Sequence, residues 1–215
     1  MALTFYWASG SPYSWRVYLA LKHKKAAFEA KLVSFDKNEN KTREFLAINP
    51  RHQVPAITDD GFALYESSAI LEYLEERFPE APRLFPGDRR ARGLARQWIS
   101  EITAYVQPAV EVLVDELFYT PEAAKRNRAA VAEARTELAV ELERIEPRLA
   151  GEWLNGELSA ADFTLYPFLA MFPRFERREP ELALASLVGP KLRSWMGRIE
   201  ALPYFDETYP PHWRA

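Results

Sequence analysis

The sequence predicts two parts of different fold class: an α/β domain over residues 1–80 and an all-helical bundle over residues 88–215. Three observations carry this prediction. Short strand-like and helix-like runs alternate in the first part. Prolines and a glycine then crowd residues 81–87, which is typical of a linker. Beyond the linker the apolar residues recur at helical spacing, and no strand pattern of comparable strength returns.

The first part has the order β-α-β-α-β-β-α. The expected elements are, in chain order, a strand over 3–7, a helix over 15–21, a strand over 28–35, a helix over 45–48, strands over 54–58 and 62–65, and a helix over 69–78 that ends at Pro79. Breaker residues separate the first strand from the first helix. Between the last two strands, Asp59-Asp60-Gly61 tolerates positive φ, so the sequence predicts a β-hairpin there.

The second part contains long amphipathic helices. Apolar residues follow helical spacing over 94–117 and again over 131–149, and Pro108 is expected to kink the first of these helices. Ser159 and Asp162 have the spacing of a capping box, with Leu158 and Phe163 placed as a hydrophobic staple. A third helix is therefore expected from about Ala160 through to Phe172.

Composition excludes several classes of function. The chain has 215 residues, a formal charge of −3 and no cysteine, so disulfides, thiolate metal sites and a cysteine nucleophile are ruled out. The balanced charge gives no reason to expect a nucleic-acid or membrane partner. The three histidines, His23, His52 and His212, are too dispersed to predict a metal site. With no signal peptide and no apolar run long enough to span a membrane, a cytoplasmic location is expected.

Four motifs, in this order and spacing, resemble those of the glutathione transferase family. They are Ser11-Pro12-Tyr13-Ser14-Trp15-Arg16-Val17, Asn49-Pro50-Arg51-His52-Gln53-Val54-Pro55, Glu66-Ser67-Ser68-Ala69-Ile70-Leu71-Glu72-Tyr73-Leu74, and Ser159 to Asp162. The similarity covers essentially the whole chain and is nearest to the zeta and tau classes, which carry a serine at the position of Ser11. It implies a thioredoxin-like glutathione-binding domain, a helical domain that contributes a hydrophobic substrate pocket, and a homodimer.

The resemblance makes Ser11 the expected catalytic residue. Glutathione reacts as its thiolate, and lowering a thiol pKa of about 8.5 by two units requires about 2.7 kcal/mol. A hydroxyl hydrogen bond to a charged acceptor supplies about 1.5–3 kcal/mol. A helix N-terminus adds about 0.3–1 kcal/mol. Ser11 stands at the start of the first helix, where both effects are available.

Other interpretations of this motif stay open. A serine before a proline is also an ordinary helix N-cap. Ser9, Ser14 and Tyr6 are rival hydroxyls for the thiol. Tyr6 matters most, because other classes of the family use a tyrosine at the end of the first strand, although a tyrosine packed in the core explains it equally simply.

The other motifs imply a binding surface for the rest of the tripeptide. The resemblance implies a cis Val54-Pro55 bond that leaves the Val54 backbone free to pair with the cysteinyl unit. Glu66 and Ser67, at the start of the third helix, suit the γ-glutamyl end, with simple capping as the alternative. His52, Gln53 and Lys41 are weaker candidates for the glycyl carboxylate, and a surface role fits each of them as well.

The electrophilic substrate is expected between the loop before the first helix and the bundle. The candidate lining residues are Tyr13, Tyr105, Val106, Phe168, Phe172, Arg174 and Phe175. Most aromatic residues at helical spacing belong to a core, which is the alternative for these. Arg174 would bind a substrate carboxylate by charge-assisted hydrogen bonds, or lie exposed beside other arginines.

The expected function is transfer of glutathione to small apolar electrophiles, as in detoxification, with glutathione as co-substrate and no metal. A zeta-like cis–trans isomerase of the maleylacetoacetate type is one alternative. The zeta motif has a cysteine two residues after its serine, however, where this chain has Tyr13. A non-catalytic binding protein of the same fold is the other alternative, and peroxidase activity also stays open.

Overall fold

The computed structural model describes residues 3–120 and 122–214, which form two compact units. The first unit runs up to Pro86 and also includes the segment from Leu202 onward, and the second is Gly87–Ala201. The first unit contains a mixed sheet with helices and the second is helical, so the predicted fold class is confirmed.

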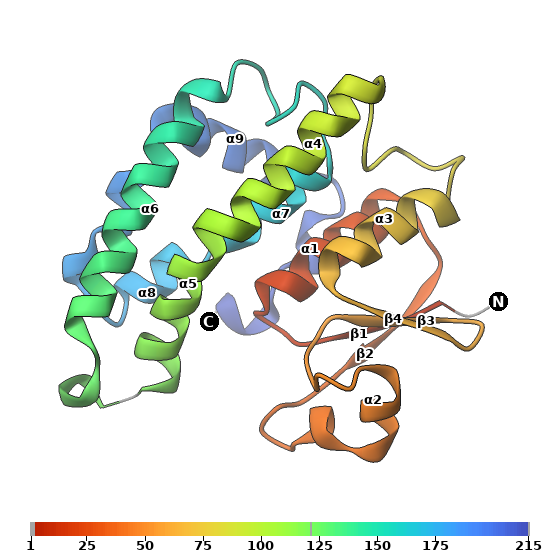
Figure 1. Cartoon of the computed structure of the whole chain (residues 1–215), viewed down its shortest axis with the longest axis horizontal. Coiled ribbons are helices and arrows are strands. Elements are labelled where there is room, and N and C mark those ends of the chain that lie inside the picture. The colour runs from red at the N-terminus through yellow and green to blue at the C-terminus, as the bar shows by residue number, and fades with distance from the viewer. Residues whose placement is uncertain (1–2, 121, 215) are drawn as a thin grey trace. The chain divides into compact units, whose positions relative to one another are not determined.

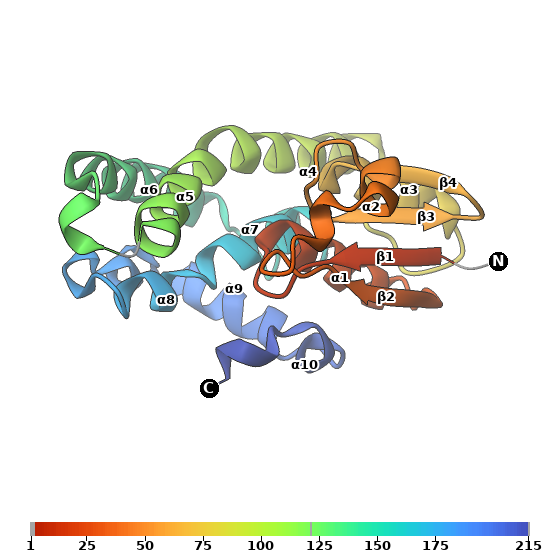
Figure 2. The same cartoon turned by 90° about the horizontal axis from the view of Figure 1, so that it is seen from below.

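The first unit is built on a four-stranded sheet in the order β2-β1-β3-β4. Its elements are β1 Leu3–Trp7, α1 Pro12–His23, β2 Phe28–Leu32, a 3-10 turn Glu39–Lys41, α2 Arg43–Ile48, β3 Ala56–Asp59, β4 Phe62–Tyr65, α3 Ser67–Arg77, α10 Phe205–Thr208 and a 3-10 turn Pro211–Trp213. Strand β1 pairs parallel with β2 and antiparallel with β3, as the arrows in Figure 2 show. Helices α1 and α3 cover one face of the sheet, and α2 lies on the other (Figure 1).

The predicted hairpin between β3 and β4 is confirmed. The two strands pair antiparallel, from Asp59 with Phe62 to Ala56 with Tyr65. Asp60 and Gly61 at the turn both have positive φ, 49° and 88°. Two consecutive residues of this kind match the right-handed twist of the flanking strands.

The segment after Leu202 belongs to the first unit, although helical spacing alone predicts that all of residues 88–215 lie in the helical domain. The reason is packing against Trp15 of α1. Its indole Nε1 donates a hydrogen bond of 3.0 Å to Thr208 Oγ1, and its ring lies 5.4 Å from that of Trp213. Periodicity shows that a segment has an apolar face but not which unit covers that face.

The second unit contains the longer helices (Figure 1). Its elements are α4 Arg89–Glu101, a π-helical segment Ile102–Val106, α5 Gln107–Val114, a π-helical segment Asp115–Tyr119, a 3-10 turn Ala123–Lys125, α6 Arg128–Arg148, α7 Ala160–Leu169, α8 Phe172–Glu176, 3-10 turns Pro180–Leu182 and Leu184–Leu187, and α9 Pro190–Glu200. Just before Pro108, where a kink is expected, the chain forms the first π-helical segment. Proline has no N–H for the carbonyl four residues earlier, and just before it the Gln107 N–H bonds five residues back, to the Ile102 carbonyl.

Helix α7 begins at Ala160, as the capping pattern predicts, with Ser159 as its N-cap. The carboxylate of Asp162 accepts a hydrogen bond of 2.8 Å from the Ser159 N–H, which is half of a capping box. The helix ends at Leu169 rather than continuing to Phe172, and α8 starts there as a separate turn with Pro173 in its first positions.

Candidate functional site

The sheet topology brings the predicted glutathione-binding segments to one end of the first unit. Tyr6, near the end of β1, pairs with Ala56 at the start of β3, and Ala56 pairs with Tyr65 at the end of β4. The chain after β1, the chain before β3 and the chain after β4 therefore meet at the same end of the sheet. These are the segments that carry Ser11, Val54 and Ser67.

Ser11 closes a four-residue turn and begins α1. Its N–H donates to the Ala8 carbonyl (3.2 Å), and Gly10 in the third position has a φ of 84°, as in a type II turn. Ser11 is the N-cap, and its Oγ accepts a hydrogen bond of 3.2 Å from the Ser14 N–H. Within residues 3–120 and 122–214 this is the sole hydrogen bond of the hydroxyl, so its own proton is available to an acceptor outside the chain.

The rival hydroxyls differ from that of Ser11 in burial or in their contacts. Ser14 is buried, and its Oγ accepts from the Ala8 N–H (3.3 Å). Ser9 Oγ shares a hydrogen bond of 2.9 Å with His212 Nδ1. The half-buried Tyr6 packs its ring on Phe45, at 6.0 Å between centroids. The capping alternative for Ser11 is observed, and it uses the oxygen as an acceptor without consuming the proton.

The Val54-Pro55 peptide bond is cis, as the resemblance implies. The Val54 side chain is buried in a small cluster with Ala8, Val33 and Phe45. Among the described residues, its backbone N–H and C=O have no hydrogen-bond partner. Unpaired backbone groups beside a strand can accept an added extended segment.

The N-terminus of α3 is uncapped. Its N-cap residue, Glu66, has a positive φ of 70° and makes no capping hydrogen bond with its side chain. The buried Ser67 follows at the first helical position. The free N–H groups and the helix dipole favour an anion at this end, such as a carboxylate.

Arg16, to which the sequence motifs gave no role, lies beside the first turn of α3. Its side chain is buried and donates to Ser68 Oγ (3.5 Å), in the first turn of α3. Burial lowers the pKa of Arg16 to about 10, so the guanidinium stays charged at neutral pH. A charged residue within the apolar pattern of the first helix is the signal that could have identified it.

His52 and Gln53 lie in the loop before Val54, Lys41 ends the 3-10 turn before α2, and all three are exposed. The buried Asn40, next to Lys41, donates a hydrogen bond of 2.9 Å to the His52 carbonyl and so ties the two parts of the loop. No hydrogen bond in the described chain fixes the side chain of Lys41, His52 or Gln53.

The predicted lining residues of the electrophile pocket divide by burial. Phe168, Phe172 and Phe175 have at most 1% of their surface exposed, and Val106 likewise, which fits the alternative of core packing. Tyr105 is 57% exposed. Arg174 is partly exposed and lies over the Phe118 ring, 5.6 Å from its centroid. Tyr13, in the first unit, is partly exposed beside Arg16, whose guanidinium lies 5.3 Å from its ring centroid.

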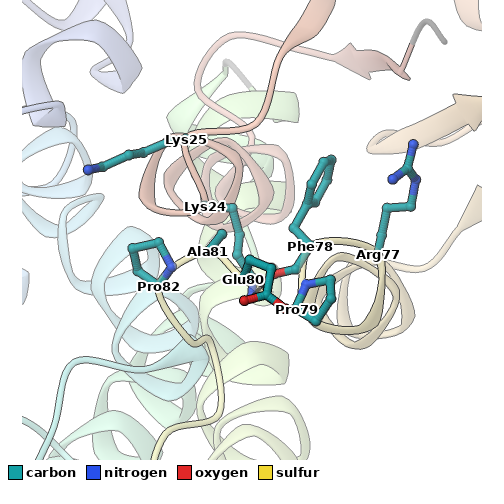
Figure 3. Close-up of a pocket in the computed structure, with 8 residues that line it drawn as sticks. All are labelled: Lys24, Lys25, Arg77, Phe78, Pro79, Glu80, Ala81 and Pro82. Atoms are coloured by element: carbon teal, nitrogen blue, oxygen red, sulfur yellow. Dashed lines mark hydrogen bonds between the residues drawn. The ribbon is translucent and has the colours of Figure 1, made fainter.

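A hollow of about 520 Å³ lies elsewhere in the first unit, where α1 and α3 end (Figure 3). It is lined by Lys24, Lys25, Arg77, Phe78, Pro79, Glu80, Ala81 and Pro82. Ser11 and Ser67 stand at the other ends of these helices, and a helix of this length spans about 18 Å. The Lys24 ammonium is already bonded to the Glu75 carboxylate and the Phe78 carbonyl. The hollow is therefore separate from the candidate site.

Residues 3–120 and 122–214 contain no group of three or more His, Asp or Glu side chains placed to hold a metal ion. None of their helices has the length and apolar character needed to cross a membrane.

Comparison with known proteins gives two family matches. The model of the glutathione S-transferase N-terminal domain matches residues 10–77, and that of the C-terminal domain matches residues 95–203. Glutathione S-transferase A of Pleuronectes platessa is 30% identical over 220 residues, covering 98% of this chain and 92% of that protein. Maleylacetoacetate isomerase of Mus musculus is 35% identical over 167 residues, covering 76% of this chain and 74% of that protein.

Solved structures agree with the fold. A glutathione S-transferase from the Antarctic clam Laternula elliptica superposes with a TM-score of 0.80 at 29% identity, and the match covers 100% of this chain and 94% of that one.

Proposed function

The chain belongs to the glutathione S-transferase family, and we propose that it transfers the thiolate of glutathione to small apolar electrophiles, with Ser11 as the catalytic residue. The observation that carries the proposal is the Ser11 hydroxyl. It stands at the N-terminus of α1, accepts one hydrogen bond from the Ser14 N–H, and keeps its proton for an outside acceptor. A thiolate at that point receives this hydrogen bond and the favourable end of the helix dipole.

The remaining groups of glutathione have complementary partners at the same end of the sheet. The unpaired backbone of Val54 suits the cysteinyl amide groups. The uncapped start of α3, with Ser67 and the buried charge of Arg16 behind it, suits the γ-glutamyl carboxylate. Lys41, His52 and Gln53 are proposed for the glycyl carboxylate, because their side chains are exposed and the Asn40–His52 hydrogen bond ties the turn that ends at Lys41 to the loop before Val54.

Replacing the proposed donor tests this mechanism. Ser11→Ala should raise the thiol pKa of bound glutathione by about one to two units and lower kcat with an activated aryl halide by about 10- to 100-fold, because it removes a hydrogen bond to a charged acceptor. Glutathione affinity, measured by calorimetry, should change far less. The thiol pKa is read from thiolate absorbance against pH.

Tyr6→Phe is the matched control, since it removes the rival hydroxyl near the end of β1. Wild-type turnover in Ser11→Ala together with loss of turnover in Tyr6→Phe would transfer the role to Tyr6. If the wild-type protein shows no heat of binding with glutathione, the proposal fails at its first step.

A second candidate function is supported by the similarity to maleylacetoacetate isomerases. This candidate is a glutathione-dependent cis–trans isomerase. The family's zeta motif differs from this chain at Tyr13, which weighs against this candidate. Rapid cis–trans isomerisation of a maleyl compound, with little conversion of aryl halides, would favour it over conjugation.

The remaining proposals concern the electrophile-binding residues, the biological role, the location and the oligomeric state. For the electrophile the proposal keeps Tyr13, Tyr105 and Arg174, whose side chains are at least partly exposed. A role in detoxification, a cytoplasmic location and a homodimer are proposed from family membership, and sedimentation velocity tests the dimer. Glutathione binding with no turnover across a panel of electrophiles and peroxides would indicate a binding protein instead.

A further inference from the structure

The segment from Tyr204 to Arg214, here called the C-terminal clasp, packs along α1. Trp15 is its centre, with the Phe205, Tyr209 and Trp213 rings 6.0, 5.6 and 5.4 Å away. Two hydrogen bonds and an ion pair also hold the clasp on α1. They join Trp15 Nε1 to Thr208 Oγ1 (3.0 Å), His23 Nδ1 to Tyr204 Oη (2.9 Å), and Lys22 to Glu207. The clasp is thus a folded part of the first unit.

The far end of the clasp reaches the turn that precedes Ser11. His212 Nδ1 and Ser9 Oγ share a hydrogen bond of 2.9 Å across 203 residues of sequence. The next residue, Gly10, has a positive φ of 84° and lies close to the clasp. A Cβ there would lie 3.1 Å from His212 Cε1 and 3.1 Å from Trp213 Nε1.

This turn determines where the Ser11 hydroxyl points. It comprises Ala8 to Ser11 and is closed by the Ser11 N–H to the Ala8 carbonyl. On the inner side it is held by the buried Ser14, whose Oγ accepts from the Ala8 N–H. Ala8 also packs in the buried cluster with Val33, Phe45 and Val54, while His212 contacts the turn at Ser9 and, with Trp213, lies close to Gly10. A small rotation of the turn would redirect the hydroxyl, and a hydrogen bond weakens steeply when its geometry is lost.

We propose that His212 is a positioning residue for the thiol site: its hydrogen bond to Ser9 holds the Ala8–Ser11 turn so that the Ser11 hydroxyl faces the glutathione sulfur. The inference rests on the proposed function of Ser11. His212 acts through Ser9 and need not touch the substrate. The clasp holds His212 in place, because the adjacent Trp213 is buried against Trp15 and fixes the backbone there.

A double-mutant cycle between the two bonded residues tests this. Ser9→Ala and His212→Ala should each lower kcat for aryl-halide conjugation by about three- to tenfold. Each should raise the thiol pKa of bound glutathione by about half a unit to one unit. The double variant should be no worse than either single variant, because both remove the same hydrogen bond. KM for glutathione should stay within about twofold, since the binding groups are elsewhere.

Two further variants separate positioning from general loss of structure. His212→Asn keeps a hydrogen-bonding group one bond from Cγ, where Nδ1 stands, and should restore most of the kcat and of the thiol pKa. Arg214→Ala is the matched control. Its guanidinium bonds to Asp206 within the clasp and not to the turn, so kcat and thiol pKa should equal the wild-type values.

Ser11→Ala, measured in parallel, keeps the two proposals distinguishable. If Ser11→Ala leaves the thiol pKa unchanged, the proposed function fails. If Ser11→Ala raises the thiol pKa but Ser9→Ala and His212→Ala leave it at the wild-type value, the role of His212 is overturned and that of Ser11 stands. Additive losses in the double variant would also overturn it.

Discussion

Asp162 is a fully buried carboxylate, and four donors converge on it. Its oxygens accept hydrogen bonds from the Leu154 N–H (2.9 Å), the Ser159 N–H (2.8 Å), the Ser159 hydroxyl (2.9 Å) and the Trp195 indole N–H (2.8 Å). Burial raises the pKa of this carboxyl, and the four donors oppose that rise by stabilising the charged form. One residue therefore joins the start of α7 to α9 and to the preceding loop.

Asp162→Asn should lower the free energy of unfolding by about 3 kcal/mol, because the amide replaces one acceptor oxygen with donors that face donors. Ser159→Ala, which removes one side-chain hydrogen bond, should cost about 1 kcal/mol. Urea denaturation followed by circular dichroism gives both values. Equal stabilities of Asp162→Asn and the wild type would contradict this account.

At the scale of single residues, the position of a side chain can be predicted from sequence where a local rule determines it. Ser159 and Asp162 follow the spacing of a capping box, and Ser11 before Pro12 has the form of an N-cap, so the position of each at a helix start was predictable. Arg16 shows the limit. Its importance comes from burial and from the neighbouring first turn of α3, 52 residues later in the sequence, and no local pattern encodes that contact.

Among the secondary-structure elements, α1 links the candidate site to the clasp, and His23 in its last turn carries a pH-dependent contact. Burial lowers the pKa of His23, as do the nearby Lys24 and Lys25, while the Arg83 carbonyl and Glu75 oppose the change. Nδ1 lies 2.9 Å from the Tyr204 hydroxyl, at the start of the clasp. The neutral imidazole is therefore the form that the folded protein favours.

The sign of the resulting pH dependence follows from linkage. In the unfolded chain His23 titrates near its ordinary pKa of about 6.5, and in the folded protein below it. Its contribution to stability is therefore complete above about pH 7.5 and is lost as the pH falls through 6.5 to the folded pKa. The loss per pH unit reaches at most about 1.4 kcal/mol. Urea unfolding between pH 8 and 5 should show this decline in the wild type and a flatter profile in His23→Gln. Parallel profiles for the two proteins would refute it.

Element order and type were predictable because apolar periodicity and turn residues are local. The hairpin at Asp60-Gly61 follows from a backbone rule that needs no tertiary context. The boundaries of the elements were less predictable. The alternating pattern predicts a strand over 28–35, yet β2 ends at Leu32, although the Val33 N–H still bonds to the Trp7 carbonyl. How far an edge strand stays paired depends on its neighbour, not on its own residues.

At the scale of the whole molecule, the first unit is discontinuous in sequence: it includes the clasp as well as the residues before Gly87. This grouping rests on three clasp residues that are buried, Phe205, Thr208 and Trp213. The sequence alone could not show to which unit the clasp belongs, because a single apolar turn can pack on either one. Its place in the first unit depends on the contact with Trp15. The fold class of each unit, by contrast, was readable from the spacing of its apolar residues.

Hydrogen exchange tests the grouping. As denaturant is raised under native conditions, amides in 204–214 should lose protection together with those of α1, and not with those of α9, because cooperative units open as wholes. Trp15→Phe removes the hydrogen bond to Thr208 and should lower protection in 204–214 while leaving α9 unchanged. Mass spectrometry of peptic fragments gives the comparison, and joint exchange of 204–214 with α9 would show the grouping to be incorrect.

The return of the chain to α1 has a consequence for how the protein is made on the ribosome. The β-strands emerge first, but the residues that cover Trp15 are translated only after the entire helical unit, a delay on the order of ten seconds. During that interval the nascent first unit exposes the indole and its aromatic surroundings.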